Sequence, residues 1–135
     1  MKPTSLLATV AAAILAVTAP TAEAAKPPLG GGCYDHSKHN NWDIGVCISN
    51  RNTDTQVYPD IYVNTVGTRP AGCFVRVYAK DDNLGRVART NDFPCEKGHY
   101  EIPHFNATPA HLYHTEVEVM PAGYVFDISP GIVYY

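Results

Sequence analysis

The stretch CFVRVYAKDDNLGRVART, residues 73–90, decides the fold class of this chain. From Cys73 to Lys80, small and apolar residues alternate with aromatic and charged residues, which is the period of two that a half-buried β-strand shows. Residues 81–85, DDNLG, have the composition of a tight turn, and residues 86–90 can return as the partner strand. The stretch therefore predicts an antiparallel β-hairpin.

Segments on both sides of this hairpin are similarly short and rich in Val, Ile, Tyr and Thr. The candidate strands lie at residues 43–49, 56–64, 99–102, 112–120, 124–128 and 132–135. Pro59 would place its strand at a sheet edge or break it at a bulge, because proline cannot donate to the strand ladder. No segment after residue 24 shows the apolar spacing of a helix. About six to eight short strands predict an all-β protein, a small disulfide-stapled antiparallel β-sandwich or barrel, with immunoglobulin-like topology as one option.

Residues 1–24 have the order of a signal peptide: Lys2, an apolar run at residues 6–17, and small residues before Ala24. Cleavage after Ala24 predicts a secreted, extracellular protein. The expected parts are the signal peptide at 1–24, a flexible Pro/Gly-rich arm at 25–32 and a single β domain at 33–135. The apolar run is about half of the roughly 20 residues that span a bilayer. The formal net charge is −3, so we expect neither a membrane nor a nucleic acid as partner.

All four cysteines lie after the predicted signal peptide, and an even number in an exported chain favours two disulfides. Four cysteines can form two disulfides in three different ways. We favour Cys33 with Cys47 and Cys73 with Cys95, because each bond then closes a short local loop. In the chain-entropy account, such loops contribute about 3 kcal/mol each.

Two groups of side chains resemble metal sites. Cys33, Asp35, His36 and His39 lie near Cys47 in sequence, but oxidation would consume both thiols, and the spacing fits no familiar zinc pattern. A polar loop stapled by a disulfide explains this segment better. The second group consists of His104, His111 and His114, which we expect at the surface because residues three apart on a strand point to opposite faces. We expect no metal and no cofactor.

The serines and the paired carboxylates give no catalytic pattern. Ser37, Ser49 and Ser129 do not lie in a glycine-flanked elbow. Asp81 and Asp82 fall in the predicted turn, and Glu116 and Glu118 fall on an exposed strand face, where solvated charges are ordinary. We therefore expect a protein that is not an enzyme. Asn106-Ala107-Thr108 matches a glycosylation acceptor, which matters only in a host that glycosylates exported proteins.

The aromatic residues and the arm point to protein contacts. Nine tyrosines, four phenylalanines and Trp42 exceed what a small core readily hides, although β-strands also favour these residues. In the arm, Pro27 and Pro28 stiffen the chain, and the three glycines at 30–32 provide a joint. Such an arm can enter a groove on a partner, or it can be a loose chain end. The predicted partner-binding residues are Lys26, Pro27, Pro28, Leu29 and Trp42.

The alanine-rich export signal, the arm, the two-disulfide body and the run PDIYVNTVGTRPAGCFVRVYAKDD at residues 59–82 resemble the small secreted adaptor subunit of bacterial umbrella toxin particles. The resemblance implies a connector without catalysis. It would join a large toxin-bearing subunit to lectin-bearing subunits that carry a degenerate trypsin-like domain, whose cleft the arm would occupy. Lys26 suits an acid-bottomed pocket, and the tertiary amide of Pro27 resists tryptic cutting.

Two other classes of function remain as alternatives. A secreted inhibitor of a protease or other hydrolase could present the loop at residues 67–72, with Arg69 and Pro70 at its tip. A small toxin or carbohydrate-binding module could use exposed aromatic rings against glycans.

Overall fold

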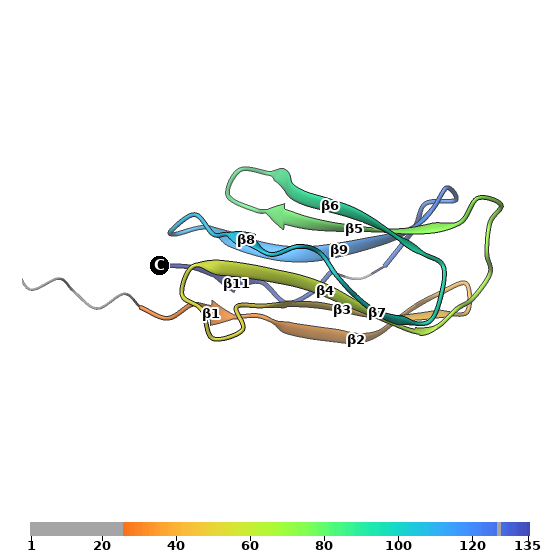
Figure 1. Ribbon diagram of the computed structural model, residues 1–135, viewed down its shortest axis with the longest axis horizontal. Helices are drawn as coiled ribbons and strands as arrows, with labels where there is room; N and C mark the ends of the chain where they lie inside the picture. The colour runs from red at the N-terminus through yellow and green to blue at the C-terminus, as the bar shows by residue number, and fades with distance from the viewer. Residues whose placement is uncertain (1–25, 127) are drawn as a thin grey trace, which may run out of the picture.

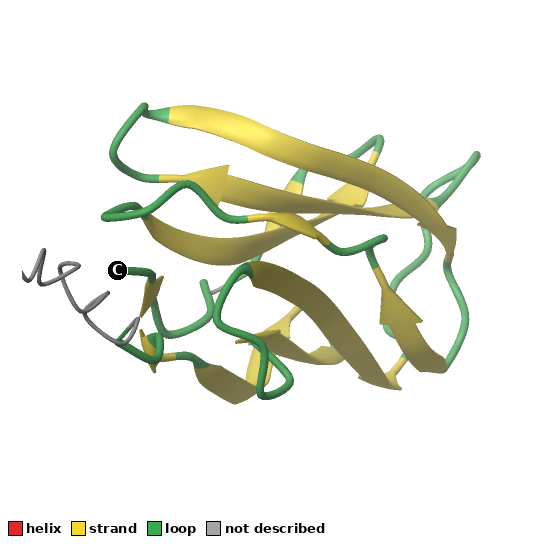
Figure 2. Ribbon diagram, turned by 60° about the vertical axis from the view of Figure 1, so that its left-hand side comes forward, coloured by secondary structure: helices red, strands yellow, loops and turns green. Residues whose placement is uncertain are grey.

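The computed structural model describes residues 26–126 and 128–135. The predicted signal peptide, the proposed cleavage site and Ala25 lie outside these residues. The described chain is all-β and contains no helix, and its strands form two antiparallel sheets packed face to face as a sandwich (Figures 1 and 2). The fold class predicted from the alternation is confirmed. No helix in the described part is long and apolar enough to cross a membrane.

The first sheet contains the predicted hairpin at one side and both ends of the described chain at the other. Its strand order is β1 (Leu29–Gly30), β11 (Ile132–Val133), β9 (Leu112–Met120), β5 (Phe74–Asp81) and β6 (Arg86–Pro94), and β10 (Tyr124–Val125) also pairs with β9. In the hairpin, Val75, Val77 and Ala79 are completely buried, as the alternation predicts. The register continues to Phe74 opposite Pro94, so the return strand is longer than expected.

The second sheet covers the inner face of the first. Its order is β2 (Gly32–His39), β3 (Trp42–Ser49), β4 (Gln56–Thr65) and β7 (Gly98–Glu101), and β8 (Phe105–Asn106) pairs with the start of β4. The sheets are joined through buried side chains: Thr115 of β9 donates its hydroxyl to the carbonyl oxygen of Cys47 on β3 at 2.7 Å. Both favoured disulfides, Cys33–Cys47 and Cys73–Cys95, are present.

The core lies between the sheets in two clusters. The larger cluster is built around Trp42 and the valines and isoleucines of β3, β4, β5 and β9, and the smaller contains Ile48, Val57, Tyr113, Ile132 and Tyr134. Full burial of such a side chain contributes about 1.5–3 kcal/mol. The strong alternation in the sequence is therefore the physical cause of the sandwich, because each strand has one face to bury.

Two predictions about local structure are wrong. Residues 33–39, expected to form a polar loop, belong to edge strand β2, in which only Ser37 is buried. An edge strand with little buried surface carries no alternation that a sequence reading could detect. Pro59 lies opposite Ile48 inside the sheet, not at its edge. The edge of β4 that faces away from β3 pairs with β8 before Pro59 and with β7 after it. Because Pro59 lies at this change of partner, its missing N–H breaks no hydrogen bond of either ladder.

Candidate binding surfaces

The glycines of the arm do not form a free joint, which corrects the expected arm. Leu29 and Gly30 pair with Val133 and Ile132, and the N–H of Gly31 donates to the carbonyl oxygen of Gly131 at 2.8 Å. Gly30 has a φ of +96°, and a Cβ there would lie 2.3 Å from the Gly131 oxygen. Glycine is required because the chain must cross from β1 in one sheet to β2 in the other through left-handed conformations. Of the described arm, only residues 26–28 precede the sheet.

Apolar side chains continue from the arm across the outer face of the first sheet. Leu29 lies opposite Val133, and Val133 lies opposite Leu112, so the three side chains share one face. Leu29 is 58% exposed, Leu112 is 38% exposed and Tyr135 is 48% exposed. We call Leu29, Leu112, Val133 and Tyr135 the outer apolar row. It lies where β1, β11 and the carboxyl terminus meet (Figure 1).

The remaining predicted arm residues lie beside this row. Lys26 and Pro27 are exposed, and Pro28 is half-buried. The Lys26 Nζ lies 5.8 Å from the centre of the Tyr135 ring, within cation–π range. The structure therefore brings Lys26 and Leu29 together with carboxyl-terminal residues. Sequence reasoning missed this proximity because the partner residues lie more than a hundred positions away.

Trp42 is not on a binding surface, so its predicted role is wrong. Its side chain is 1% exposed and belongs to the larger core cluster. Its indole Nε1 donates to the carbonyl oxygen of Thr68 at 2.8 Å, which satisfies the only polar group of the ring. Trp42 has the same parity as the buried Ile44 and Val46, and this signal in the sequence could have placed it in the core.

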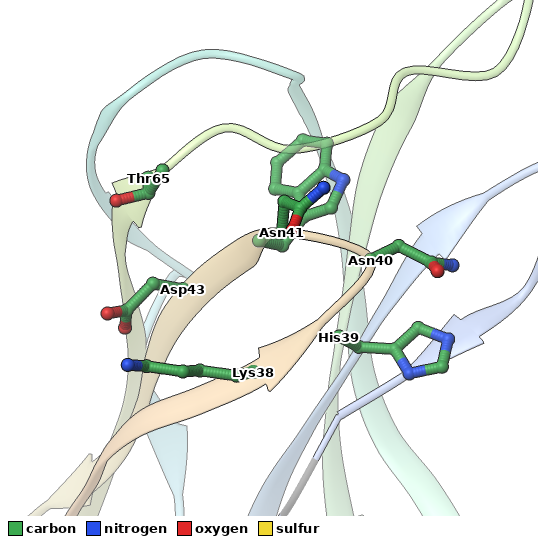
Figure 3. Close-up of a pocket in the computed structure, with 7 residues that line it drawn as sticks. Lys38, His39, Asn40, Asn41, Asp43 and Thr65 are labelled. Carbon is green, nitrogen blue, oxygen red and sulfur yellow. The ribbon is translucent and has the colours of Figure 1, made fainter.

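A shallow polar pocket of about 430 Å³ surrounds the β2–β3 turn. Lys38 and Asp43 lie on one side of the hairpin and His39 points to the other, with Asn40 and Asn41 at its tip (Figure 3). Both asparagines have positive φ, as a two-residue hairpin turn requires. The Asp43 carboxylate accepts hydrogen bonds from neighbouring side chains, Asn64 at 3.3 Å and His36 at 3.2 Å. Burial raises the pKa of Asp43, but these hydrogen bonds outweigh it and hold the pKa below its ordinary value. The Asp43 carboxylate of this pocket is thus held in its charged form.

Two acids, at the end of β5 and at the start of the turn that follows, are paired with one histidine just before β9 and one near its start. Asp81 is 3% exposed, and His111 donates from Nδ1 to its carboxylate at 2.8 Å. Asp82 accepts from His114 at 2.8 Å. The sequence predicts that Asp81 is solvated and that His114 lies at the surface. Both predictions are wrong, because both side chains are buried. The turn brings residues about thirty positions apart into contact, which single-strand periodicity does not reveal.

The environment of Asp81 favours its charged form. Burial alone raises the pKa of an aspartate, but the hydrogen bond from His111 and the bond from the N–H of Leu84 outweigh it. The pKa of Asp81 therefore lies below its ordinary value. Each oxygen of the carboxylate accepts one of these two bonds, so Asp81 acts as a structural anion.

The candidate metal ligands are engaged in other bonds. Cys33 and Cys47 are joined in a disulfide, so they supply no thiolates. A cluster that the sequence did not suggest contains Asp60, His99 and Glu101, with the His99 Nε2 at 2.7 Å from the Asp60 carboxylate. Arg51 donates to Glu101, and the His99 ring stacks on Tyr62 at 4.2 Å. This cluster is satisfied as an ion-pair network.

No protein-family model matches the chain, and neither do curated proteins or solved structures.

Proposed function

We propose that this chain is a secreted, non-catalytic adaptor that protein partners bind through residues 26–29 and the outer apolar row. The observation that carries the proposal is the continuity of this surface. Leu29, Val133 and Leu112 lie side by side on the outer face of the sheet, and Leu29 joins the row directly to the arm. Exposed apolar side chains gathered into one patch are a feature of interaction sites.

The chemistry of this surface suits a groove on another protein. Pro27 and Pro28 limit the entropy that the arm loses on docking. Among the described strands β1 is the last of its sheet, and its outer backbone edge is where a strand of the partner would pair. Lys26 is the cation of this surface and suits an acidic pocket at the end of the groove. The two disulfides, consistent with an extracellular protein, make the body a stable spacer.

The partners that we propose are those the resemblance implies. A degenerate protease-like domain of a lectin-bearing subunit would hold the arm, and a large toxin-bearing subunit would contact the body, in an extracellular antibacterial complex. A specificity pocket with an acidic base would accept Lys26, and Pro27 after it would prevent cleavage. Neither a nucleic acid nor a membrane is part of the proposal.

Purification of the tagged protein from the culture supernatant of its host tests this proposal. We expect mass spectrometry to identify one large subunit and lectin-bearing subunits with the wild-type chain, and to find them depleted with Lys26→Glu. Lys97→Glu makes the same charge change at an exposed residue between β6 and β7 and serves as the control. Equal recovery of these subunits with Lys26→Glu, or turnover of a substrate by the isolated chain, would contradict the proposal.

A protease inhibitor is the second candidate, because the loop at residues 67–72 is fixed at its base. The N–H of Thr68 donates to the carbonyl oxygen of Asn40 at 3.0 Å, and the Thr68 carbonyl oxygen accepts from Trp42. Arg69 then stands exposed beside an anchored residue. Inhibition of an active trypsin-like protease by the wild-type chain, lost on Arg69→Ala, would favour this candidate over the adaptor.

A further inference from the structure

A cavity of about 550 Å³ lies at the end of the sandwich where β5 turns into β6, and it is separate from the arm and the outer apolar row. Its walls come from the start of β6, from β8 and the residues after it, and from the start of β9. Its lining includes Asp81, Arg86, Arg89, Phe105, Asn106 and Thr108. The β5–β6 turn and β8 lie at the same end of the molecule (Figure 1). A cavity of this size suits a ligand of two or three sugar units.

Two arginines of β6 line this cavity. Arg89 lies opposite Ala79 and Arg86 lies opposite Asp81, and both of these β5 residues are buried on the inner face of the sheet. Residues paired across a ladder share a face, so the two arginines belong to the inner face of β6. That face is uncovered at this end, and both side chains are exposed.

Neither arginine has a partner within the described protein. Arg76 forms a two-bond pair with Asp92, and Arg51 donates to Glu101. By contrast, no described side chain or carbonyl group accepts a hydrogen bond from the guanidinium of Arg86 or Arg89, and no described carboxylate forms an ion pair with either. Asp81, the carboxylate in the cavity wall, is already bound by His111 and by the N–H of Leu84. The cavity therefore has two free cations against one buried, satisfied anion.

The rest of the lining offers groups that bind hydroxyls. No described group forms a hydrogen bond with the side-chain amide of Asn106 or the hydroxyl of Thr108. The bond between Thr108 and Tyr113 uses the backbone N–H of Thr108. Phe105 is half-buried and leaves part of its ring in the wall. An amide, a hydroxyl and a ring face beside two guanidinium groups fit a polyhydroxylated ligand that carries a carboxylate.

We propose that this cavity binds a short acidic saccharide that contains a uronic acid. The sugar carboxylate lies between the guanidinium groups of Arg86 and Arg89, which form charge-assisted hydrogen bonds to it. The ring hydroxyls bind Asn106 and Thr108, and one sugar face packs on Phe105. An acidic peptide is the other source of a carboxylate, but a peptide would use the open backbone edge of β6 and would leave these side chains unused. The site does not depend on the adaptor role.

Isothermal titration calorimetry with the full secreted chain tests the site. The probes are di- and trisaccharides of galacturonate or glucuronate, uncharged galactose oligomers of the same lengths, and triglutamate. We expect a uronate to bind about tenfold or more tightly than its neutral counterpart, and Arg86→Gln or Arg89→Gln to weaken that binding by about tenfold. Lys97→Gln removes an exposed charge outside the cavity and should leave the affinity unchanged.

Thermal melts accompany the titrations. Because Arg86 and Arg89 are exposed and unpaired in the described protein, both variants should melt at the wild-type temperature, so a loss of affinity reports on the site. Equal binding of neutral and acidic sugars, unchanged affinity in both variants, or no uronate binding at millimolar concentration would each overturn the proposal. Binding of triglutamate that needs both arginines, without uronate binding, would overturn it in favour of an acidic peptide.

Discussion

Replacement of Asp81 by asparagine tests how the β5–β6 turn is held. The Asp81 carboxylate is 3% exposed and accepts from the His111 Nδ1 at 2.8 Å and from the N–H of Leu84 at 3.2 Å. Asparagine has nearly the same size and keeps one oxygen for Leu84, but it lacks the charge and the second acceptor. A hydrogen bond to a charged group contributes about 1.5–3 kcal/mol. We therefore expect Asp81→Asn to lower the free energy of unfolding by about 2 kcal/mol at pH 7.

The pH dependence of this loss has a definite sign. The pKa of Asp81 is lower in the folded protein than its ordinary value of 3.8. A group with a lowered folded pKa stabilises the protein fully above the unfolded pKa, and this stabilisation disappears as the pH falls through the folded value. The difference between the wild type and Asp81→Asn should therefore shrink as the pH falls below 3.8.

Urea unfolding followed by circular dichroism measures both quantities. Asp82→Asn is the matched control, because Asp82 also accepts from a histidine but its side chain is 35% exposed. Solvent screens such a pair, so we expect the control to lose less than about 1 kcal/mol. A loss of under about 0.5 kcal/mol for Asp81→Asn at pH 7, or a difference that grows as the pH falls below 3.8, would refute this reasoning.

Two further predictions concern stability. Trp42→Ala should lower the free energy of unfolding by about 3–5 kcal/mol, because it opens a cavity in the core and leaves the Thr68 carbonyl without its donor. A melting temperature within a few degrees of the wild type would show that the ring is not a core element. Removal of the Cys73–Cys95 disulfide by serine substitution should cost about 3 kcal/mol, since it frees a loop closed over 22 positions. An unchanged urea midpoint would contradict that expectation.

Features that depend on one strand or one hairpin could be predicted from the sequence. The alternation at residues 73–80 gives the strand, the DDNLG turn gives its hairpin, and both disulfides close local loops, as observed. The prediction for Trp42 is wrong because tryptophan is a residue type common at interfaces. Its even spacing from the buried Ile44 places it on the inward face of the strand. In that case periodicity was a better guide than residue type.

Features that depend on pairing between distant segments could not be predicted in this way. The outer apolar row needs the register of residues 29, 112 and 133, which three separate strands fix. The contact of Asp81 with His111 depends on how a turn folds against the start of β9. The glycines at 30–32 are typical of a flexible joint, yet their positive φ values serve a crossing between sheets. In each case the residue type is compatible with both the expected and the observed structure. Only the contacts with a neighbouring strand determine which of the two forms.

The affinity of a Leu29→Ser/Leu112→Ser double variant tests most directly whether partners bind the outer apolar row next to the arm. The two side chains are 58% and 38% exposed, so their burial by the lectin-bearing subunit would contribute about 1.5–3 kcal/mol in total. Biolayer interferometry with that purified subunit should show affinity about 10- to 150-fold weaker than that of the wild type. Val125→Ser, which alters a 62% exposed side chain on β10, should bind like the wild type. Equal affinity of the double variant and the wild type, with both folded, would contradict the account.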